Sequence, residues 1–285
     1  MKLTDLNTVR NLLSEFEASP DKRYGQNFLI SEKVVINIAE DCGADENDGI
    51  LEIGPGIGVL TQKLCERYKK VVSVEIDKKM TAILGKTMAE SGNFTLINND
   101  ILKTDLNSLL SEHFSGMKVT VCANLPYYIT TPIIMYLLES EIPFENITVM
   151  VQKEVADRLT AKPGSADYGA ITPAVNYYAD VQKLFTVPAG CFYPAPKVDS
   201  AVVRFRLRKL PEYEPNDKEL MFEIIKYAFL QRRKTLSNAL SSDKRLKKPD
   251  IEAAINECGF DPRVRGETLS VADFRRLSDV LSVKL

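Results

Sequence analysis

The sequence has a single histidine and only five cysteines, and it contains no long apolar run. The cysteines are widely scattered, so they form neither a disulfide framework nor the paired spacing of a metal site. No apolar segment approaches the roughly 18 to 20 residues that a membrane helix needs. We therefore expect no bound metal and no membrane-spanning segment.

Residues 1–10 also lack the charged-then-apolar plan of a signal peptide, so a cytoplasmic protein is expected. The composition, with 45% hydrophobic and 27% charged residues, is that of an ordinary globular protein. A chain of 285 residues is long enough to bury a sizeable core in one or two domains.

Charge is distributed unevenly along the chain, whose net charge is −2. From Cys191 to the C-terminus there are 19 Lys and Arg against 14 Asp and Glu, whereas residues 1–190 contain 18 against 25. Clustered positive charge is what contacts a nucleic-acid backbone. Any such contact is therefore expected in the C-terminal third.

Between residues 49 and 151, short apolar runs alternate with amphipathic stretches, which indicates a parallel sheet with crossover helices. Amphipathic helices are expected before this region, at 5–16 and 31–42, with a polar loop at 24–29. The alternation in residues 200–207 favours an edge or half-exposed strand. The expected strands are 50–53, 71–74, 94–97, 119–123, 147–151, 184–187 and 200–207.

After residue 217 the strand patterns end, and four helical patterns follow. Ser270 and Asp273 form a capping box before the last of them. Residues 209–217, which are rich in proline and charge, are typical of a linker. The sequence thus predicts an α/β domain at 1–208, with N-terminal helices and a loop in 1–48, then the linker and an all-α domain at 218–285.

A glycine-rich turn, Glu52-Ile53-Gly54-Pro55-Gly56-Ile57-Gly58, follows the first of the alternating strands. Such a turn lets the backbone approach a ligand closely, and the following helix offers free N–H groups. Its spacing departs from the Gly-x-Gly-x-x-Gly fingerprint of dinucleotide sites. It resembles the first motif of class I S-adenosylmethionine-dependent methyltransferases, with Gly54 and Gly56 as cofactor contacts.

Acidic residues follow the next two strands. Glu75 lies about twenty residues beyond the turn, where a carboxylate can accept both ribose hydroxyls, a requirement shared with NAD enzymes. Asp100 is placed to accept a hydrogen bond from a cofactor adenine, although a loop or cap residue is the alternative. The adjoining Ile76 and Ile101 are included in the predicted cofactor site.

The tetrapeptide Asn124-Leu125-Pro126-Tyr127 follows the fourth strand. Adenine N6 has a delocalised lone pair, so it needs hydrogen-bond acceptors at its N–H groups to become nucleophilic. The Asn124 side-chain oxygen and the Leu125 carbonyl can supply them, with Pro126 fixing the backbone. Tyr127 can stack on the base. No strong base is required, and the one histidine, His113, is expected at the surface.

The tetrapeptide alone would suit adenine N6, cytosine N4 or a glutamine amide. Together with its companion motifs, however, the chain resembles the rRNA adenine N6-dimethyltransferases nearly from end to end, most closely the KsgA type that acts on small-subunit rRNA. The resemblance is carried by Gly25-Gln26-Asn27-Phe28-Leu29, the turn at 52–58, Glu75, Asn99-Asp100, Asn124 to Tyr127, Phe192-Tyr193-Pro194-Ala195-Pro196-Lys197-Val198-Asp199-Ser200, and Gln231-Arg232-Arg233-Lys234-Thr235-Leu236.

This resemblance implies a Rossmann-like class I fold and transfer of two methyl groups from S-adenosylmethionine to N6 of each of two adjacent adenosines near the 3′ end of 16S rRNA. The partner would be the small ribosomal subunit or its precursor, with the enzyme a monomer. Gln26, Asn27 and Leu29 would close over the methionine end of the cofactor, and Asn124 would also contact it. Phe192 would cover the second face of the flipped base, with core packing as the alternative.

The densest basic runs lie in the C-terminal domain, where they suggest RNA phosphate contacts, with a solvated helix face as the alternative. The residues expected to bind RNA are Arg232, Arg233, Lys234, Lys244, Arg245, Lys247 and Lys248.

Three rival functions remain: a large-subunit rRNA methylase of the macrolide-resistance type, an NAD(P) oxidoreductase, and a ribosome-assembly or transcription factor without catalysis. The stretch 231–236 and the long helical tail favour the small-subunit target. The presence of all motif residues argues against a purely structural role.

Overall fold

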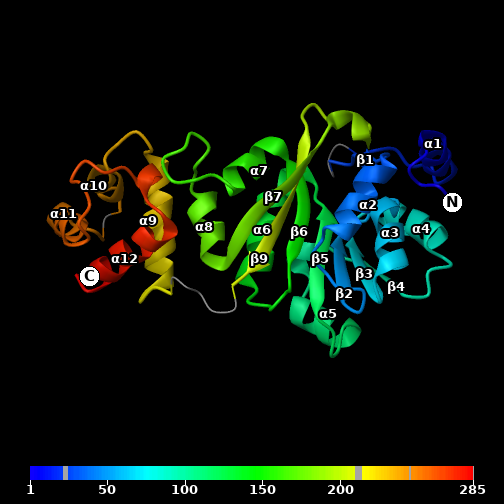
Figure 1. Cartoon of the computed structure of the whole chain (residues 1–285), viewed down its shortest axis with the longest axis horizontal. Helices are drawn as coiled ribbons and strands as arrows, with labels where there is room; N and C mark the ends of the chain where they lie inside the picture. The colour runs from blue at the N-terminus through cyan, green and yellow to red at the C-terminus, as the bar shows by residue number, and fades with distance from the viewer. Residues whose placement is uncertain (22–24, 209–213, 244, 285) are drawn as a thin grey trace. The chain divides into compact units, whose positions relative to one another are not determined.

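A mixed sheet forms the centre of the N-terminal part of the chain (Figure 1). The computed structural model describes residues 1–21, 25–208, 214–243 and 245–284. Among these residues, seven strands pair in the order β4-β3-β2-β5-β6-β9-β7. The strands from β4 to β6 are parallel, and β9 is antiparallel to β6. Their bounds are β2 (Gly49–Ile53), β3 (Lys70–Glu75), β4 (Phe94–Asn98), β5 (Val119–Asn124), β6 (Ile147–Gln152), β7 (Ala179–Val187) and β9 (Ser200–Leu207).

Helices alternate with the parallel strands, as the sequence pattern predicts. Every residue of β2 is buried, and only the last residue of β5 is partly exposed, because helices cover a parallel sheet on both faces. The helices of this region are α1 (Leu6–Glu15), α2 (Glu32–Glu40), α3 (Val59–Arg67), α4 (Lys78–Thr87), α5 (Leu106–His113), α6 (Thr130–Glu139) and α7 (Lys153–Leu159). Short 3-10 turns are η2 (Ile101–Lys103), η3 (Tyr127–Ile129) and η4 (Ala189–Cys191).

Two details of the sheet differ from the sequence-based expectation. The prediction of an edge or half-exposed strand at 200–207 is wrong: β9 lies between β6 and β7, and its first four residues are buried. The loop expected at 24–29 contains a short strand, β1 (Phe28–Leu29), which pairs antiparallel with β8 (Phe192–Tyr193). This pairing joins segments more than 160 residues apart, which no local pattern reveals.

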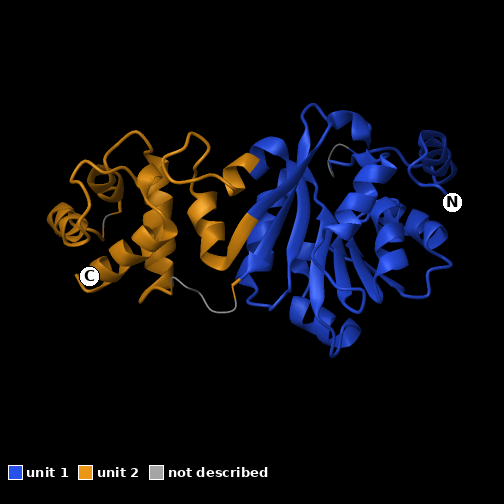
Figure 2. Cartoon of the chain, in the orientation of Figure 1, with its two compact units in different colours: residues 1–156, 182–207 blue, residues 157–181, 208–285 orange. Residues whose placement is uncertain are grey.

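The chain divides into two compact units (Figure 2). Unit 1 comprises residues 1–156 and 182–207, and unit 2 comprises residues 157–181 and 208–285. The expected division assigned 157–181 to the α/β domain, whereas their contacts group them with the C-terminal helices. Tyr168 donates a hydrogen bond to the Leu269 carbonyl (2.6 Å), and Tyr177 packs edge-on against Phe222 (5.5 Å between ring centroids). Residues 209–213 of the expected linker lie outside the described residues.

Unit 2 has its own helical core. Phe274 and Leu277 of the last helix are fully buried, together with Ile224 of α9. The capping box that the sequence predicts at Ser270 and Asp273 is confirmed. The helices are α8 (Ile171–Tyr178), α9 (Lys218–Leu230), α10 (Leu236–Leu240), α11 (Lys248–Glu257) and α12 (Val271–Ser282), with a 3-10 turn η5 (Gly266–Thr268). Within the described ranges, no helix is long and apolar enough to cross a membrane.

Candidate active site

A pocket lies at the edge of the sheet where the parallel strands end. The turns that follow β2, β3, β4 and β5 all contribute to its wall, together with the segment that contains β1. The ten residues expected to bind the cofactor all line this pocket: Gln26, Asn27, Leu29, Gly54, Gly56, Glu75, Ile76, Asp100, Ile101 and Asn124. The structure therefore brings together in one cavity residues spread over almost 100 positions of sequence.

The glycine-rich turn brings backbone, without side chains, to the pocket wall. Gly54 and Gly56 have φ angles of 66° and 58°, in the left-handed region that favours glycine. A Cβ on Gly56 would lie 3.3 Å from the ring of Phe28, which also lines the pocket. The turn thus lets a ligand come close to the backbone. A larger residue in place of these glycines would narrow the pocket.

Glu75 is held in place by backbone donors. Its carboxylate accepts hydrogen bonds from the N–H of Gly56 (3.1 Å) and the N–H of Asp77 (2.9 Å). Burial raises the pKa of Glu75 to about 7. A carboxylate has about four acceptor positions, so these backbone donors do not use up its capacity to accept a ligand hydroxyl. This arrangement fits the expected contact with the ribose of S-adenosylmethionine.

Two other expected cofactor contacts are oriented by the loops that carry them. Gln26 donates from Nε2 to Asp77 (2.8 Å) and accepts from the N–H of Asp21 (2.8 Å). Asp100 accepts a hydrogen bond from the N–H of Leu102 (3.0 Å). One of its oxygens therefore caps the following turn, which is the alternative role considered from the sequence. The residue also lines the pocket.

A second buried carboxylate, Glu52, lies on β2 at the start of the glycine-rich turn and also lines the pocket. The hydroxyls of Thr61 and Ser73 both donate to its Oε2, at 2.8 and 2.6 Å. Its burial, and the charge of Glu75 nearby, raise the pKa of Glu52 to about 7 despite these bonds. The folded state is therefore less stable when Glu52 is ionised. Such a destabilising group is consistent with a position beside a ligand pocket.

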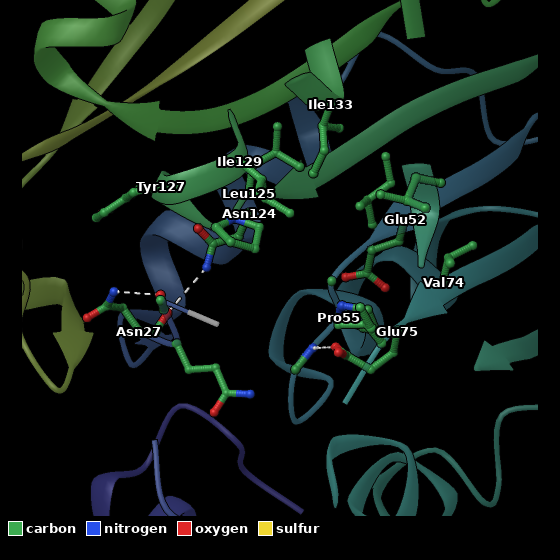
Figure 3. A pocket seen from close by; sticks show the side chains of 18 of the residues that line it. Asn27, Glu52, Pro55, Val74, Glu75, Asn124, Leu125, Tyr127, Ile129 and Ile133 are labelled. Atoms are coloured by element: carbon green, nitrogen blue, oxygen red, sulfur yellow. Dashed lines mark hydrogen bonds between the residues drawn. The ribbon is translucent and has the colours of Figure 1, made fainter. Parts of the chain in front are cut away.

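The tetrapeptide at 124–127 forms the opposite end of the pocket. In Figure 3, Glu75 and Pro55 lie on one side and Tyr127 on the other, with Asn124 between them. The Asn124 amide donates from Nδ2 to the Asn27 carbonyl (3.3 Å). Its Oδ1 has no hydrogen-bond partner among the described residues. Asn124 is therefore oriented as an acceptor for an N–H group of a ligand.

Backbone contacts fix the turn that contains Pro126. The Pro126 carbonyl accepts from the Ile129 N–H (3.3 Å) and from the hydroxyl of Thr130 (3.0 Å), which is 2% exposed. Leu125 is also buried, and its N–H donates to the carbonyl of Met150 on β6 (3.2 Å). The turn is thus anchored at both ends.

Tyr127 is anchored through its hydroxyl. The Tyr127 hydroxyl and the Ser200 hydroxyl are 2.6 Å apart, and Ser200, the first residue of β9, is completely buried. Burial raises the pKa of Tyr127, so the phenol stays neutral. Ser200 belongs to a motif that the sequence singled out, but its contact with Tyr127 was not predicted.

Phe192 occupies a different environment from the one expected. Its side chain is 3% exposed and belongs to the hydrophobic core of unit 1. Phe192 pairs across β1–β8 with buried Leu29 and is not among the residues that line the pocket, so its stacking on a bound base stays a prediction. The core-packing alternative describes its position.

Several pocket residues carried no recognisable sequence signal. Tyr128, Ile129 and Ile133 line it from η3 and the start of α6. They follow the tetrapeptide directly, so their proximity to it in sequence was the only clue. His113 does not line the pocket. Among the described residues, no group of His, Cys, Asp and Glu side chains is arranged to hold a metal ion.

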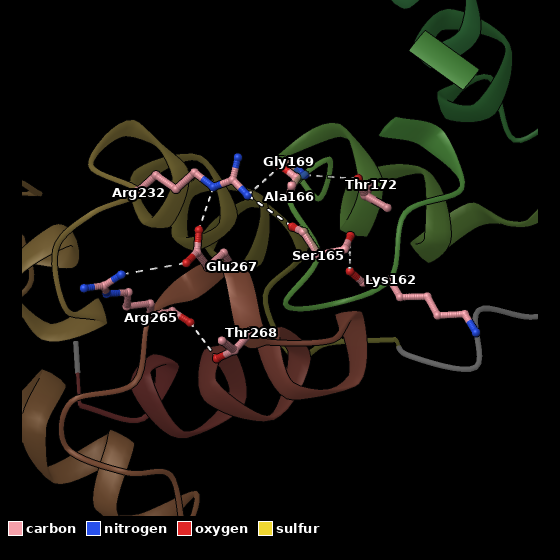
Figure 4. Close-up of polar contacts among 9 residues, drawn as sticks. All are labelled: Lys162, Ser165, Ala166, Gly169, Thr172, Arg232, Arg265, Glu267 and Thr268. Carbon is pink, nitrogen blue, oxygen red and sulfur yellow. Dashed lines mark hydrogen bonds and ion pairs between the residues drawn. The ribbon is translucent and has the colours of Figure 1, made fainter. Parts of the chain in front are cut away.

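Arg232, the first residue of one expected RNA-binding run, is bound within unit 2 (Figure 4). Its Nε donates to the Glu267 carboxylate (2.6 Å), and its Nη2 donates to the carbonyls of Ser165 (3.2 Å) and Ala166 (2.9 Å). Glu267 also accepts the N–H of Gly164 on its carbonyl (2.7 Å). The guanidinium thus holds the loop before α8 against the turn before α12.

The other expected RNA contacts fall into two groups. Arg245 bonds to Asp243 (2.6 Å) and to Glu223, and Lys248 bonds to Asn238 (3.1 Å). By contrast, Arg233, Lys234 and Lys247 are exposed, and no side-chain hydrogen bond or ion pair links them to the described part of the chain. Lys244 lies outside the described residues. The free charges are thus fewer than the sequence suggests.

The buried carboxylates predict a pH dependence of stability. The ordinary pKa of a glutamate is 4.5, and that of Glu52 in the folded state is about 7. Between these values the folded protein binds more protons than the unfolded chain, so the free energy of unfolding falls as pH rises. Glu52→Gln keeps an acceptor oxygen for Thr61 and Ser73 but cannot ionise. We expect a flatter decline for this variant in urea denaturation between pH 5 and 8.

The raised pKa of Glu75 remains in Glu52→Gln, so part of the decline should persist. Parallel curves for the wild type and the variant would contradict the expectation.

Comparisons with known proteins show the family of the chain. The family model described as ribosomal RNA adenine dimethylase matches residues 18–282. "Ribosomal RNA small subunit methyltransferase A" from Bacillus cereus (strain AH187) and from Bacillus anthracis (strain CDC 684 / NRRL 3495) are each 45% identical over 283 residues, covering 96% of both chains.

Solved structures show the same architecture. A dimethyladenosine transferase from Plasmodium falciparum superimposes with a TM-score of 0.74 at 25% identity, over 88% of this chain and 95% of its own. The 23S rRNA methyltransferase ErmE gives a TM-score of 0.69 at 26% identity, over 90% and 100%. The predicted class I S-adenosylmethionine-dependent fold and cofactor are confirmed. The chain belongs to the ribosomal RNA adenine dimethylase family.

Proposed function

We propose that this chain transfers methyl groups from S-adenosylmethionine to N6 of two adjacent adenosines near the 3′ end of small-subunit rRNA. The observation that carries this proposal is the pocket with two chemically different ends: an acceptor carboxylate at Glu75 and an oriented amide at Asn124. The first end fits a ribose, and the second fits an amine whose N–H groups must be held.

The residues of the chain divide the work between them. Glu75 and the turn at Gly54 and Gly56 hold S-adenosylmethionine, which supplies an activated methyl group when bound. Asn124 Oδ1 and the Leu125 carbonyl accept the N6 hydrogens and so turn the nitrogen lone pair towards the methyl group. Tyr127 supports one face of the extruded base, whose lost stacking must be replaced. The ring is preorganised because Ser200 holds its hydroxyl.

The small-subunit target is favoured over the large-subunit target by the relatives. The Bacillus proteins that match at 45% identity over 96% of the chain carry a small-subunit name, whereas ErmE, a 23S rRNA methyltransferase, is 26% identical. We further propose that the enzyme acts as a monomer in the cytoplasm.

A direct test compares the two subunits as substrates. Purified protein is incubated with labelled S-adenosylmethionine and separated, undermethylated small and large subunits. Label should enter the small subunit, and primer extension on small-subunit rRNA from cells lacking the protein should lose two adjacent stops. Label in the large subunit alone would favour the macrolide-resistance type of activity. Binding of NAD without S-adenosylmethionine would favour an oxidoreductase.

Asn124→Ala removes the oriented acceptor. We expect kcat to fall by about 100- to 1000-fold, the usual loss when one preorganised hydrogen-bonding group at the reacting centre is removed. Affinity for S-adenosylmethionine, measured by calorimetry, should change little because Glu75 and the glycine-rich turn are untouched. An unchanged kcat would assign the polarisation of the amine to other residues.

Ser200 and Tyr127 should act as a unit in catalysis. Ser200→Ala and Tyr127→Phe each remove one half of the same hydrogen bond, so each should lower kcat several-fold, about 2- to 10-fold. The double variant should be no slower than the slower single variant, because the bond can be lost only once. Kinetic assays on small subunits give the three values. Multiplicative losses would show that the two hydroxyls act separately.

Arg233→Ala combined with Lys234→Ala should weaken RNA binding. Each lost phosphate contact should also reduce the slope of log affinity against log salt by about 0.7 to 0.9. Arg232→Ala is the matched comparison from the same run of charge. It should mainly lower the melting temperature, because Glu267 and two loop carbonyls lose their donor. The reverse pattern would assign the RNA contact to Arg232.

A further inference from the structure

The tetrapeptide is followed by a second tyrosine, which is more exposed than the first. Tyr127 is half-buried, whereas Tyr128 is 54% exposed, and both line the pocket. Large apolar side chains with this exposure are few in the described structure, and only Tyr128 and Ile76 among them line the pocket. An exposed aromatic residue beside a ligand cavity is a surface for a ligand.

The backbone holds Tyr128 firmly at this place. It lies in the middle of η3, between Pro126 and the buried Thr130, which are joined by the hydrogen bond from the Thr130 hydroxyl. On the other side, its ring lies 3.6 Å from the position a Cβ would take on Gly25, so the loop that precedes β1 borders it. The turn thus fixes the backbone of Tyr128, while Gly25 borders its ring.

We propose that Tyr128 stacks on the nucleotide adjoining the flipped adenosine, and so forms a second base-binding subsite at the mouth of the pocket. Tyr128 follows Tyr127 directly in the chain, and both residues line the same pocket. When the flipped base lies against Tyr127, its neighbour in the strand is therefore the base within reach of Tyr128. The inference rests on the proposed function, since its ligand is the same RNA.

This subsite gives the enzyme a means of holding adjacent adenosines. A base stacked on an aromatic ring is bound with little preference for its identity, because every base offers a flat face. The base that is not in the pocket would thus be held outside it while its neighbour reacts. Tyr128 contributes to RNA affinity in this arrangement and makes no contact with the reacting nitrogen.

The test separates RNA binding from cofactor binding. KM values for small subunits and for S-adenosylmethionine are measured for Tyr128→Ala, Tyr128→Leu and Tyr128→Phe. Loss of the ring in the first two variants should raise the RNA KM about ten-fold, within the range of one stacking contact, and change the cofactor KM less than about two-fold. Tyr128→Phe keeps the ring and should match the wild type.

Ile76→Ala is the matched control, because Ile76 is 44% exposed and lines the other end of the pocket beside Glu75. It should raise the cofactor KM and spare the RNA KM. The inference fails if Tyr128→Ala leaves the RNA KM unchanged, if Tyr128→Leu retains full RNA affinity, or if Tyr128→Ala behaves like Ile76→Ala. If wild-type protein transfers no methyl group to small subunits, the proposed function fails and this inference with it.

Discussion

The register of three parallel strands determines the geometry of the whole site. Glu52 on β2 is paired with Ser73 on β3 and with Cys122 on β5. Counting two residues onward along each strand brings Gly54, Glu75 and Asn124 into one row at the carboxyl edge. Neighbouring strands are about 4.8 Å apart, so Glu75 and Asn124, the proposed acceptors for the ribose and for the amine, are separated by two strand spacings, roughly 10 Å. A one-residue slip of β5 would turn Asn124 to the other face of the sheet.

Hydrogen bonds within the protein already orient the polar side chains at this edge of the sheet. The Asn124 amide donates to the Asn27 carbonyl, and the Tyr127 hydroxyl is bonded to the Ser200 hydroxyl. Ser200 faces Gln152 at the end of β6, so the antiparallel strand β9 is what delivers this hydroxyl to the site. Oriented groups need not reorganise when charge develops on the reacting nitrogen. Burial raises the pKa of Glu52 and Glu75, so the ionised form of each lowers the stability of the folded state.

Much of the fold and the cofactor site could be predicted from the sequence, because both depend on local patterns. Short apolar runs indicated the parallel strands, and polar residues after them indicated the edge where Glu75 and Asp100 lie. The contacts that were missed join distant segments. Nothing near Phe192 in sequence shows that it pairs with Leu29, and nothing near Tyr168 shows that its hydroxyl bonds to the Leu269 carbonyl. Whether a side chain is buried depends on segments that are distant in sequence, so local patterns do not reveal it.

From the sequence alone, the number of basic side chains available to contact RNA is overestimated. Arg232 and Arg233 are neighbours of equal charge, yet Arg232 is neutralised by Glu267 and occupied by two carbonyls, while Arg233 is exposed without such a partner among the described residues. Arginine suits the first role because its planar fork can satisfy several acceptors at once. A paired guanidinium adds little net charge to a surface that must attract phosphates. If RNA binds unit 2 as proposed, the charges available to its phosphates are those of the exposed Arg233, Lys234 and Lys247.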